Sequence, residues 1–368
     1  MLRVMAEIFL EAISVVVAFA QQLRFHVLPG LRPEIRELRA WDGAKDRFIL
    51  IYVGYSQAID DFSRSYLGRL KKHGAYVIFV TNFPGFDVQS LDSSCVDVYI
   101  DNRDRGWDFA QYKTASEYVM ERFGEDVPQK VVYANDSVFY VERNGDDHVS
   151  NLLDEQFDFV GAFELSGRGR NSPWHLSSWL FSVSRGLFLS EEMRGFWSGH
   201  LPLKNKRYAI RNGEHKLTAI ALAYSSKVRA IYSNDYLISA LRQSISRKGS
   251  DRTFALISSA IQNSYERKFR DPVDAEDFMN FVRRNLYAFS PIHVFSLLLI
   301  ADFEFPFIKK DLFWFGNQTY DALWKFEEVI SQVAGMEVAS ELLRYFLRRG
   351  RLSEAGLKYR LKQRIGLA

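Results

Sequence analysis

Four short apolar runs in the first half of the chain constrain its fold more than any other feature. Each is rich in aliphatic, β-branched and aromatic residues, which is typical of strands buried on both faces of a sheet. Segments with helical spacing of apolar residues lie between some of them, at about 60–73 and 108–122. Strands alternating with helices predict a mostly parallel sheet with right-handed crossovers, which is an α/β fold. The four runs are 48–53 (FILIYV), 75–80 (AYVIFV), 96–100 (VDVYI) and 131–134 (VVYA).

The second half of the chain changes character. FDFVGAFEL and VRAIYS predict two more strands, at 157–165 and 228–233, and 175–188 predicts a strand that runs into a helix continuing to Trp197. Arg211-Asn212-Gly213 predicts a turn, with a helix beginning at Glu214. From about Tyr236 the pattern is helical, with breaks at the prolines. We therefore expect an N-terminal helical segment at 1–46, an α/β domain at 47–235 and a helical C-terminal region with a basic tail at 236–368.

The two ends of the chain have amphipathic patterns. Val4 to Ala20 is apolar, but Glu7 and Glu11 interrupt it and the remaining run is too short to span a bilayer. We expect an amphipathic helix there, packed on the protein or resting on a membrane. At the other end the basic residues greatly outnumber the acids, which fits either an anionic membrane surface or a solvated helix. The basic residues are Arg344, Arg348, Arg349, Arg351, Lys358, Arg360, Lys362 and Arg364, against the single acid Glu354.

Composition excludes several classes of protein. One cysteine, Cys95, excludes a disulfide framework within the chain and a cysteine zinc site, and favours the cytosol. The formal net charge of +3 gives no signature of nucleic-acid binding. No GxGxxG or GxxxxGK[ST] pattern follows a predicted strand, so ordinary dinucleotide and P-loop binding are not expected.

Polar residues follow several of the predicted strands at the point where each strand ends. Tyr55 follows the first strand, Asn82 the second, and Asn135-Asp136-Ser137 the strand at 131–134. In open α/β sheets, ligands bind beyond the carboxyl ends of the strands. Asp108, after the Arg105-Gly106-Trp107 loop, opens a predicted helix. Both aspartates also fit local roles, Asp136 in a turn and Asp108 as an N-cap.

Seven segments, in this order, carry a resemblance that covers about residues 48–320: DRGWDFAQYK, VVYANDSVFY, HLSSWLF, EEMRGFW, RNGEHKLT, SPIHVF and FPFIKKDLF. They resemble the rhamnan synthesis protein F family of bacterial cell-surface polysaccharide glycosyltransferases, and more broadly the layout is similar to inverting glycosyltransferases of the GT-A type. The chain departs from the pattern at Asp104, at Ser177 and at 290–293 (SPIH), and 135–137 supplies one carboxylate where the GT-A motif supplies two.

The resemblance implies a site for a nucleotide-sugar donor at the strand ends. It implies that Asp136 ligates Mg²⁺ or Mn²⁺ bridging the two phosphates, or, without a metal, that Arg168 and Arg170 supply the positive charge. Gly106 would permit close approach of the backbone. The donor-binding residues implied are Val53, Gly54, Tyr55, Asn82, Arg103, Arg105, Gly106, Asp108, Asn135 and Asp136.

Glu214 is the general base that the resemblance implies, with His175 as the second candidate. The expected start of a helix at Glu214 would keep its carboxylate ionised, and a histidine exchanges protons near neutral pH. His293 and the FPFIKKDLF segment are expected to close the C-terminal region against the α/β domain. Lys309 and Lys310 within that segment fit either contact with an anionic lipid carrier or a structural role.

Three functions are consistent with these features. The first is a nucleotide-sugar glycosyltransferase, with dTDP-rhamnose or another donor, acting on a glycan or lipid-linked glycan in the cytoplasm or at the inner face of the cell membrane. The second is a non-catalytic partner in glycan assembly with a degenerate GT-A fold, which the single carboxylate at 135–137 favours. The third is a sugar phosphotransferase. Nucleic acid is not an expected partner.

Overall fold

The structure is a computed structural model that describes residues 33–102, 106–141, 147–165, 173–257, 274–286, 290–313 and 320–349, together with residues 16, 20 and 262. Four predictions therefore fall wholly or mostly outside the described residues. They concern the N-terminal amphipathic helix, the pair Arg103 and Arg105, the loop arginines Arg168 and Arg170, and the basic tail beyond Arg349.

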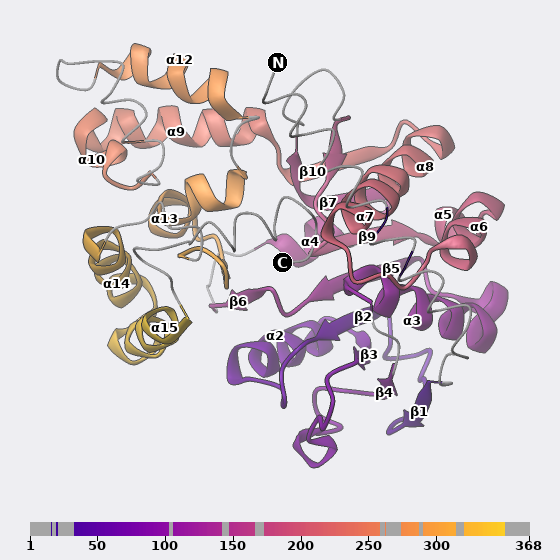
Figure 1. Cartoon of the computed structure of the whole chain (residues 1–368). Coiled ribbons are helices and arrows are strands. Elements are labelled where there is room, and N and C mark those ends of the chain that lie inside the picture. Colours follow the sequence, from indigo (N-terminus) through magenta and orange to yellow (C-terminus); the bar gives the residue numbers. More distant parts are fainter. Residues whose placement is uncertain are drawn as a thin grey trace.

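A nine-stranded mixed sheet forms the centre of the molecule (Figure 1). Its order is β1-β4-β3-β2-β5-β9-β7-β10, with β8 paired to β7. β2, β3, β4 and β5 run parallel, as do β7 and β10, whereas β9 is antiparallel to both of its neighbours. The predicted α/β class with a mostly parallel sheet is confirmed. The strands are β1 (Glu34–Glu37), β2 (Phe48–Gly54), β3 (Ala75–Thr81), β4 (Val98–Asp101), β5 (Lys130–Asn135), β7 (Phe159–Leu165), β8 (His175–Leu176), β9 (Leu180–Ser184) and β10 (Val228–Tyr232).

Alternate residues of the strands enter two separate cores, one on each face of the sheet. In β2, Ile49, Ile51 and Val53 pack in one core, whereas Leu50 and Tyr52 pack in the other. This is the period of two that a strand imposes on its side chains, and burial on both faces explains the continuous apolar runs. Helices α3 (Asp108–Phe123), α5 (Arg185–Leu189), α6 (Glu191–Gly199) and α8 (Lys216–Tyr224) supply the first core, and α2 (Asp61–Lys72) and α4 (His148–Leu152) contribute to the second.

The helical C-terminal region packs on the second of these two faces. Its buried residues belong to the same core as Leu50 and Tyr52 of β2, and Figure 1 shows these helices gathered beside the sheet. The prediction of a helical C-terminal region is confirmed. The helices are α9 (Asn234–Lys248), α10 (Ser250–Phe254), α12 (Ala275–Asn285), α13 (Pro291–Phe303), α14 (Tyr320–Ala334) and α15 (Met336–Arg349).

One strand of this region was not predicted. β11 (Phe307–Lys309) pairs antiparallel with β6 (Val138–Tyr140), which directly follows the turn after β5. Close by, His293 Nε2 lies 2.9 Å from an Asp311 oxygen. The expectation that the FPFIKKDLF segment closes the C-terminal region against the α/β domain is therefore confirmed by the pairing of β11 with β6, whereas the His293 contact joins α13 to Asp311 within the C-terminal region.

The predicted turn at 211–213 is wrong. The chain is helical from Lys206 to Tyr224, through α7 (Lys206–Tyr208), a π-helix (Ala209–His215) and α8. Gly213 is buried in this helical segment, and a Cβ added there would lie 2.5 Å from ring atoms of Phe109. The glycine therefore permits close packing, and Glu214 lies inside a helical segment and not at its start.

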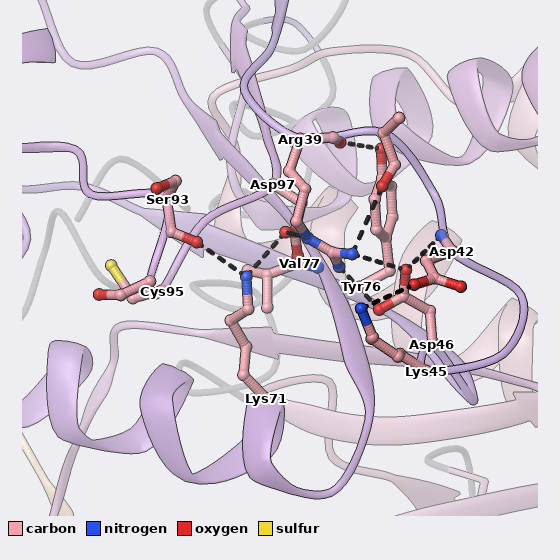
Figure 2. A network of polar contacts seen from close by, with 12 residues as sticks. Arg39, Asp42, Lys45, Asp46, Lys71, Tyr76, Val77, Ser93, Cys95 and Asp97 are labelled. Carbon is pink, nitrogen blue, oxygen red and sulfur yellow. Dashed lines mark hydrogen bonds and ion pairs between the residues drawn. The ribbon is translucent and has the colours of Figure 1, made fainter.

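A buried aspartate ties the polar edge strand β1 and its following loop to the sheet (Figure 2). Asp97 is fully buried, and its carboxylate accepts from Arg39, from Lys71 Nζ at 2.7 Å and from the Val77 N–H at 2.8 Å. Arg39 also pairs with Asp46 at 2.7 Å. Because removal of one member would leave a buried charge unpaired, this network fixes the segment that leads into β2.

Candidate active site

The carboxyl ends of the parallel strands bring several of the predicted residues together. The Tyr55 N–H, just after β2, donates to Asp136 Oδ2 at 2.9 Å. Asn82, just after β3, donates from Nδ2 to the Gly106 carbonyl at 3.0 Å. Asn135, at the end of β5, donates from Nδ2 to Asp108 Oδ2 at 3.2 Å. The sheet therefore places Tyr55, Asn82, Asp108, Asn135 and Asp136 along one edge, as open α/β sheets place their ligand-binding residues.

Asp108 begins α3, one residue later than an N-cap would stand. The N-cap is Trp107, which makes no side-chain capping bond, and Asp108 Oδ1 accepts from the Phe109 N–H at 3.1 Å. The expected N-cap role is therefore wrong by one position. Its other oxygen, Oδ2, remains directed to Asn135 and to the Ser178 hydroxyl.

Ser178 connects the two carboxylates at the centre of this site. Its Oγ lies 2.7 Å from Glu214 Oε1 and 3.4 Å from Asp108 Oδ2, and its N–H lies 3.2 Å from Glu214 Oε1. Sequence reasoning did not single out Ser178. The signal available for it was its place in HLSSWLF, one of the segments that carry the family resemblance.

The two candidate bases, Glu214 and His175, lie in the same cluster. His175 is buried, its Nε2 lies 3.6 Å from Glu214 Oε2, and its Nδ1 lies 3.0 Å from the Pro173 carbonyl. Since a carbonyl only accepts, Nδ1 carries a proton and Nε2 is the atom that faces Glu214. The His215 ring is 4.4 Å from the His175 ring, and burial, followed by His175, lowers the pKa of His215.

The environment of Asp108 gives it a pKa different from that of an ordinary surface carboxyl. Burial, with the charge of Glu214 as the next cause, raises the pKa of Asp108 from 3.8 to about 6. Two carboxylates that share one donor disfavour each other's charge. Glu214 lies inside a helical segment and not at the helix start that the sequence predicted, and the hydroxyl and backbone N–H of Ser178 orient its carboxylate.

Two lysines of the β11 segment approach the same strand ends. Lys309 Nζ donates to Ser137 Oγ at 2.8 Å, and Lys310 Nζ pairs with Asp60 Oδ2 at 2.8 Å. Burial lowers the pKa of Lys309, opposed by the carboxylates of Asp311, Asp108 and Glu214. The site is thus a set of carboxylates with an ammonium group among them.

The surroundings of Asp136 do not fit a divalent cation. Asp136 Oδ2 already accepts from the Tyr55 N–H, and Lys310 and Lys309 act on the carboxyl electrostatically. Burial raises the pKa of Asp136, which disfavours the charged form that a metal needs. Within the described ranges, no group of three or more His, Cys, Asp or Glu side chains is placed to hold a metal, so a Mg²⁺ at Asp136 would need the phosphates of the donor and water for most of its ligands.

The remaining predicted residues at the strand ends have structural partners. The Val53 side chain is fully buried in the core, and its carbonyl accepts from the Asp136 N–H at 2.9 Å. An added Cβ on Gly54 would lie 2.6 Å from the Phe79 ring, and one on Gly106 would lie 2.0 Å from the Ala110 Cβ. These glycines permit close internal packing. In the described part of the chain the buried Tyr55 hydroxyl has no hydrogen-bond partner.

Comparison with known proteins gives distant relatives. No family model matches the chain, so membership in the rhamnan synthesis protein F family stays a prediction. Two relatives from Vibrio anguillarum, one of them from strain ATCC 68554 / 775, are each named virulence protein VirA. Each is 25% identical over 205 residues, which are 54% of this chain and 63% of the relative. The chain therefore spans less than two thirds of the length of these relatives.

Two solved structures that are similar to this chain are both glycosyltransferases. The mannosyltransferase PcManGT from Pyrobaculum calidifontis, in complex with GDP-Man and Mn²⁺, has a TM-score of 0.34 at 13% identity, over 92% of this chain and 96% of that one. A glycosyltransferase involved in glycosylation of the major capsid of PBCV-1 has a TM-score of 0.30 at 11% identity, over 53% of this chain and 89% of that one. TM-scores of this size are too low to assign a function or ligand to this chain.

Among the described residues, no helix is both long enough and apolar enough to cross a bilayer.

Proposed function

We propose that this chain is a GT-A-like, inverting glycosyltransferase that uses a nucleotide-sugar donor to build a bacterial cell-surface polysaccharide. The observation that carries the proposal is the carboxylate pair of Asp108 and Glu214, joined by Ser178 at the carboxyl edge of the sheet. An acceptor hydroxyl needs a base beside the bound donor, and this edge is where an α/β sheet binds ligands.

The donor nucleoside is proposed to lie against the strand ends at Tyr55 and Asn82, with Asp108 and Asn135 beside it. The Tyr55 hydroxyl is buried without a partner among the described residues, which suits a group that a ligand completes. The contact between Asn82 and the Gly106 carbonyl holds the loop before α3 against the end of β3. Arg103 and Arg105 belong to the same proposed donor site by resemblance.

Glu214 is the proposed general base. It removes the proton from the acceptor hydroxyl while the acceptor oxygen forms a bond to the anomeric carbon. The bond from that carbon to the donor diphosphate breaks, and its electron pair leaves with the nucleoside diphosphate. Ser178 and His175 position Glu214 from either side of its carboxylate. Attack opposite the leaving group inverts the anomeric configuration.

The finer assignments follow the family resemblance. They are dTDP-rhamnose or another nucleotide sugar as the donor, a glycan or lipid-linked glycan as the acceptor, and a position in the cytoplasm or at the inner face of the cell membrane. Residues 47–235 are proposed as the catalytic domain, and 236–368 as the region that supplies β11 to it.

Thermal unfolding with a panel of nucleotides and nucleotide sugars tests this function. A ligand that binds only the folded state raises Tm with its concentration and affinity. We expect one nucleotide family to raise Tm in the wild type and in Glu214→Gln, because the base is not needed to bind the donor. A well-folded wild type that no nucleotide or nucleotide sugar stabilises would contradict the proposal.

A further inference from the structure

Lys309 is paired differently from three other partly buried cations, Arg39, Lys71 and Lys310. Arg39 and Lys71 pair with Asp97, and Lys310 pairs with Asp60 at 2.8 Å. Among the described residues, Lys309 has no carboxylate within ion-pair distance; its Nζ donates to Ser137 Oγ at 2.8 Å and lies 5.8 Å from the centre of the Trp179 ring. An ammonium group has three N–H donors, so Lys309 keeps donors for a ligand.

The backbone fixes Lys309 at the site. Lys309 lies opposite Val138 in the antiparallel pairing of β11 with β6, and the Lys310 N–H donates to the Ser137 carbonyl at 2.9 Å. Ser137 belongs to the turn that follows β5, so Lys309 lies beside the strand end that carries Asn135 and Asp136. A residue held on a strand at a binding site is positioned more firmly than one on a loop.

The carboxylates that act on the Lys309 ammonium lie beyond ion-pair distance among the described residues, and two of them have closer partners of their own. The carboxylates of Asp311, Asp108 and Glu214 act on its ammonium, and Lys206 opposes them. Asp311 is itself held by His293 at 2.9 Å, and Glu214 by Ser178. Burying an ammonium without a close counter-charge is costly, and a polyphosphate bound there supplies that counter-charge.

We infer that Lys309 binds the diphosphate of the donor and stabilises its charge as it leaves, in place of a divalent cation at Asp136. The inference rests on the proposed function and deepens it. Lysine acts at phosphates as a compact point charge. This role of Lys309 accounts for the single carboxylate at 135–137 and for the surroundings of Asp136, which do not fit a metal. When the bond between the anomeric carbon and the diphosphate breaks, its electron pair goes to the diphosphate oxygen. The Lys309 ammonium stabilises the negative charge on that oxygen, and the charge of Lys309 does not change.

Isothermal calorimetry on the full chain tests this role. UDP, GDP, dTDP and CDP are titrated in EDTA, and the tightest binder is then compared with its nucleoside monophosphate. We expect Lys309→Gln to weaken nucleoside diphosphate binding by about 10–100-fold, the effect of one charge-assisted hydrogen bond. The monophosphate should lose less, because it lacks the β-phosphate. Lys309→Arg should retain much of the affinity, since it restores the charge.

Lys310→Gln is the matched control, because the neighbouring lysine is already paired with Asp60. We expect it to change diphosphate affinity by less than Lys309→Gln does. Thermal unfolding without ligand checks that each variant folds, and Lys309→Arg keeps the test decisive if Lys309→Gln does not fold.

Two results would overturn the inference and leave the proposed function in place: equal diphosphate affinity in Lys309→Gln and the wild type, or wild-type binding that EDTA abolishes and Mn²⁺ restores. A wild type that binds none of the four diphosphates, either in EDTA or with Mn²⁺, would overturn both the inference and the proposed function.

Discussion

Ser178 donates its hydroxyl hydrogen bond to Glu214 over 2.7 Å, although the two residues are 36 positions apart in the chain. The bond links the segment between β8 and β9 to the π-helix before α8. It therefore sets the position of the proposed base from outside the base's own helix. Four predictions follow from the packing and charges around this site and its scaffold.

Glu214→Gln should abolish most sugar transfer and leave donor binding close to normal. The substitution keeps the shape of the side chain and removes its ability to take a proton, which costs about 10²–10⁴-fold in rate for a general base. Glu192→Gln, at an exposed position on α6, is the control and should leave the rate unchanged. Rates are compared once a donor is known; normal turnover by Glu214→Gln would remove Glu214 from the mechanism.

Asp108→Asn should make the protein more stable at neutral pH. Because the folded-state pKa of Asp108 is raised to about 6 from 3.8, the folded chain binds more protons than the unfolded chain between those values. Stability from this group is therefore present below about pH 4, is lost as pH rises to about 6, and stays lost above it. We expect Asp108→Asn to be more stable by about 1–2 kcal/mol at pH 7.5, with a smaller difference at pH 4.

Urea unfolding of the Asp108→Asn variant and the wild type at pH 4, 5, 6 and 7.5 measures this difference. A gap between the two proteins that does not vary with pH would show that Asp108 titrates normally. In the pH profile of transfer activity, the same variant should also lose the acidic limb near pH 6, because the carboxyl beside the base that titrates there is absent.

Gly213→Ala should destabilise the fold although alanine is the better helix former. The added Cβ would lie 2.5 Å from the Phe109 ring, which is buried and held by its own core, and overpacking of this kind costs about 1–3 kcal/mol. Gly195→Ala in α6 is the matched control, since its Cβ would meet nothing within 4 Å. The control should gain up to about 1 kcal/mol. Urea unfolding measures both, and equal stabilisation by both variants would contradict the packing role of Gly213.

Asp97→Asn should destabilise the fold by about 3–5 kcal/mol, because it leaves Arg39 and Lys71 facing a neutral side chain in a buried site. Asp42→Asn, at the exposed end of the same network in Figure 2, should change stability far less. Denaturant unfolding compares the two. Similar small effects from both variants would mean that the network does not secure the segment before β2.

The sequence predicted the parallel strands well because each is an apolar run buried on both faces. β2 is fully buried along its length, and its predicted bounds differ from the observed ones by one residue. β1 was missed because its sequence, EIRE, is polar, and no local pattern indicates that this edge strand pairs with β4. β11 was missed because three residues paired with a distant partner carry too little signal.

The site was predictable in its parts and less so in its connections. Polar residues at strand ends identified Tyr55, Asn82, Asn135 and Asp136, and the parallel sheet brought them to one edge. Gly213 led to the wrong prediction of a turn, because a glycine fits both a turn and a close contact. Only the nearby Phe109 ring in the folded structure distinguishes the two. The meeting of Lys309 with Ser137 depends on tertiary pairing over 172 positions, which no local pattern reveals.

Release of nucleoside diphosphate from a panel of UDP-, GDP-, CDP- and dTDP-sugars, measured with and without polyprenyl-diphosphate-linked glycan acceptors, tests the proposed glycosyl transfer. We expect the wild type to release the diphosphate from at least one donor, and Glu214→Gln, folded and still able to bind that donor, to release it at least about 100-fold more slowly. Release at equal rates by the two proteins, or no release from any donor by the folded wild type, would contradict the proposal.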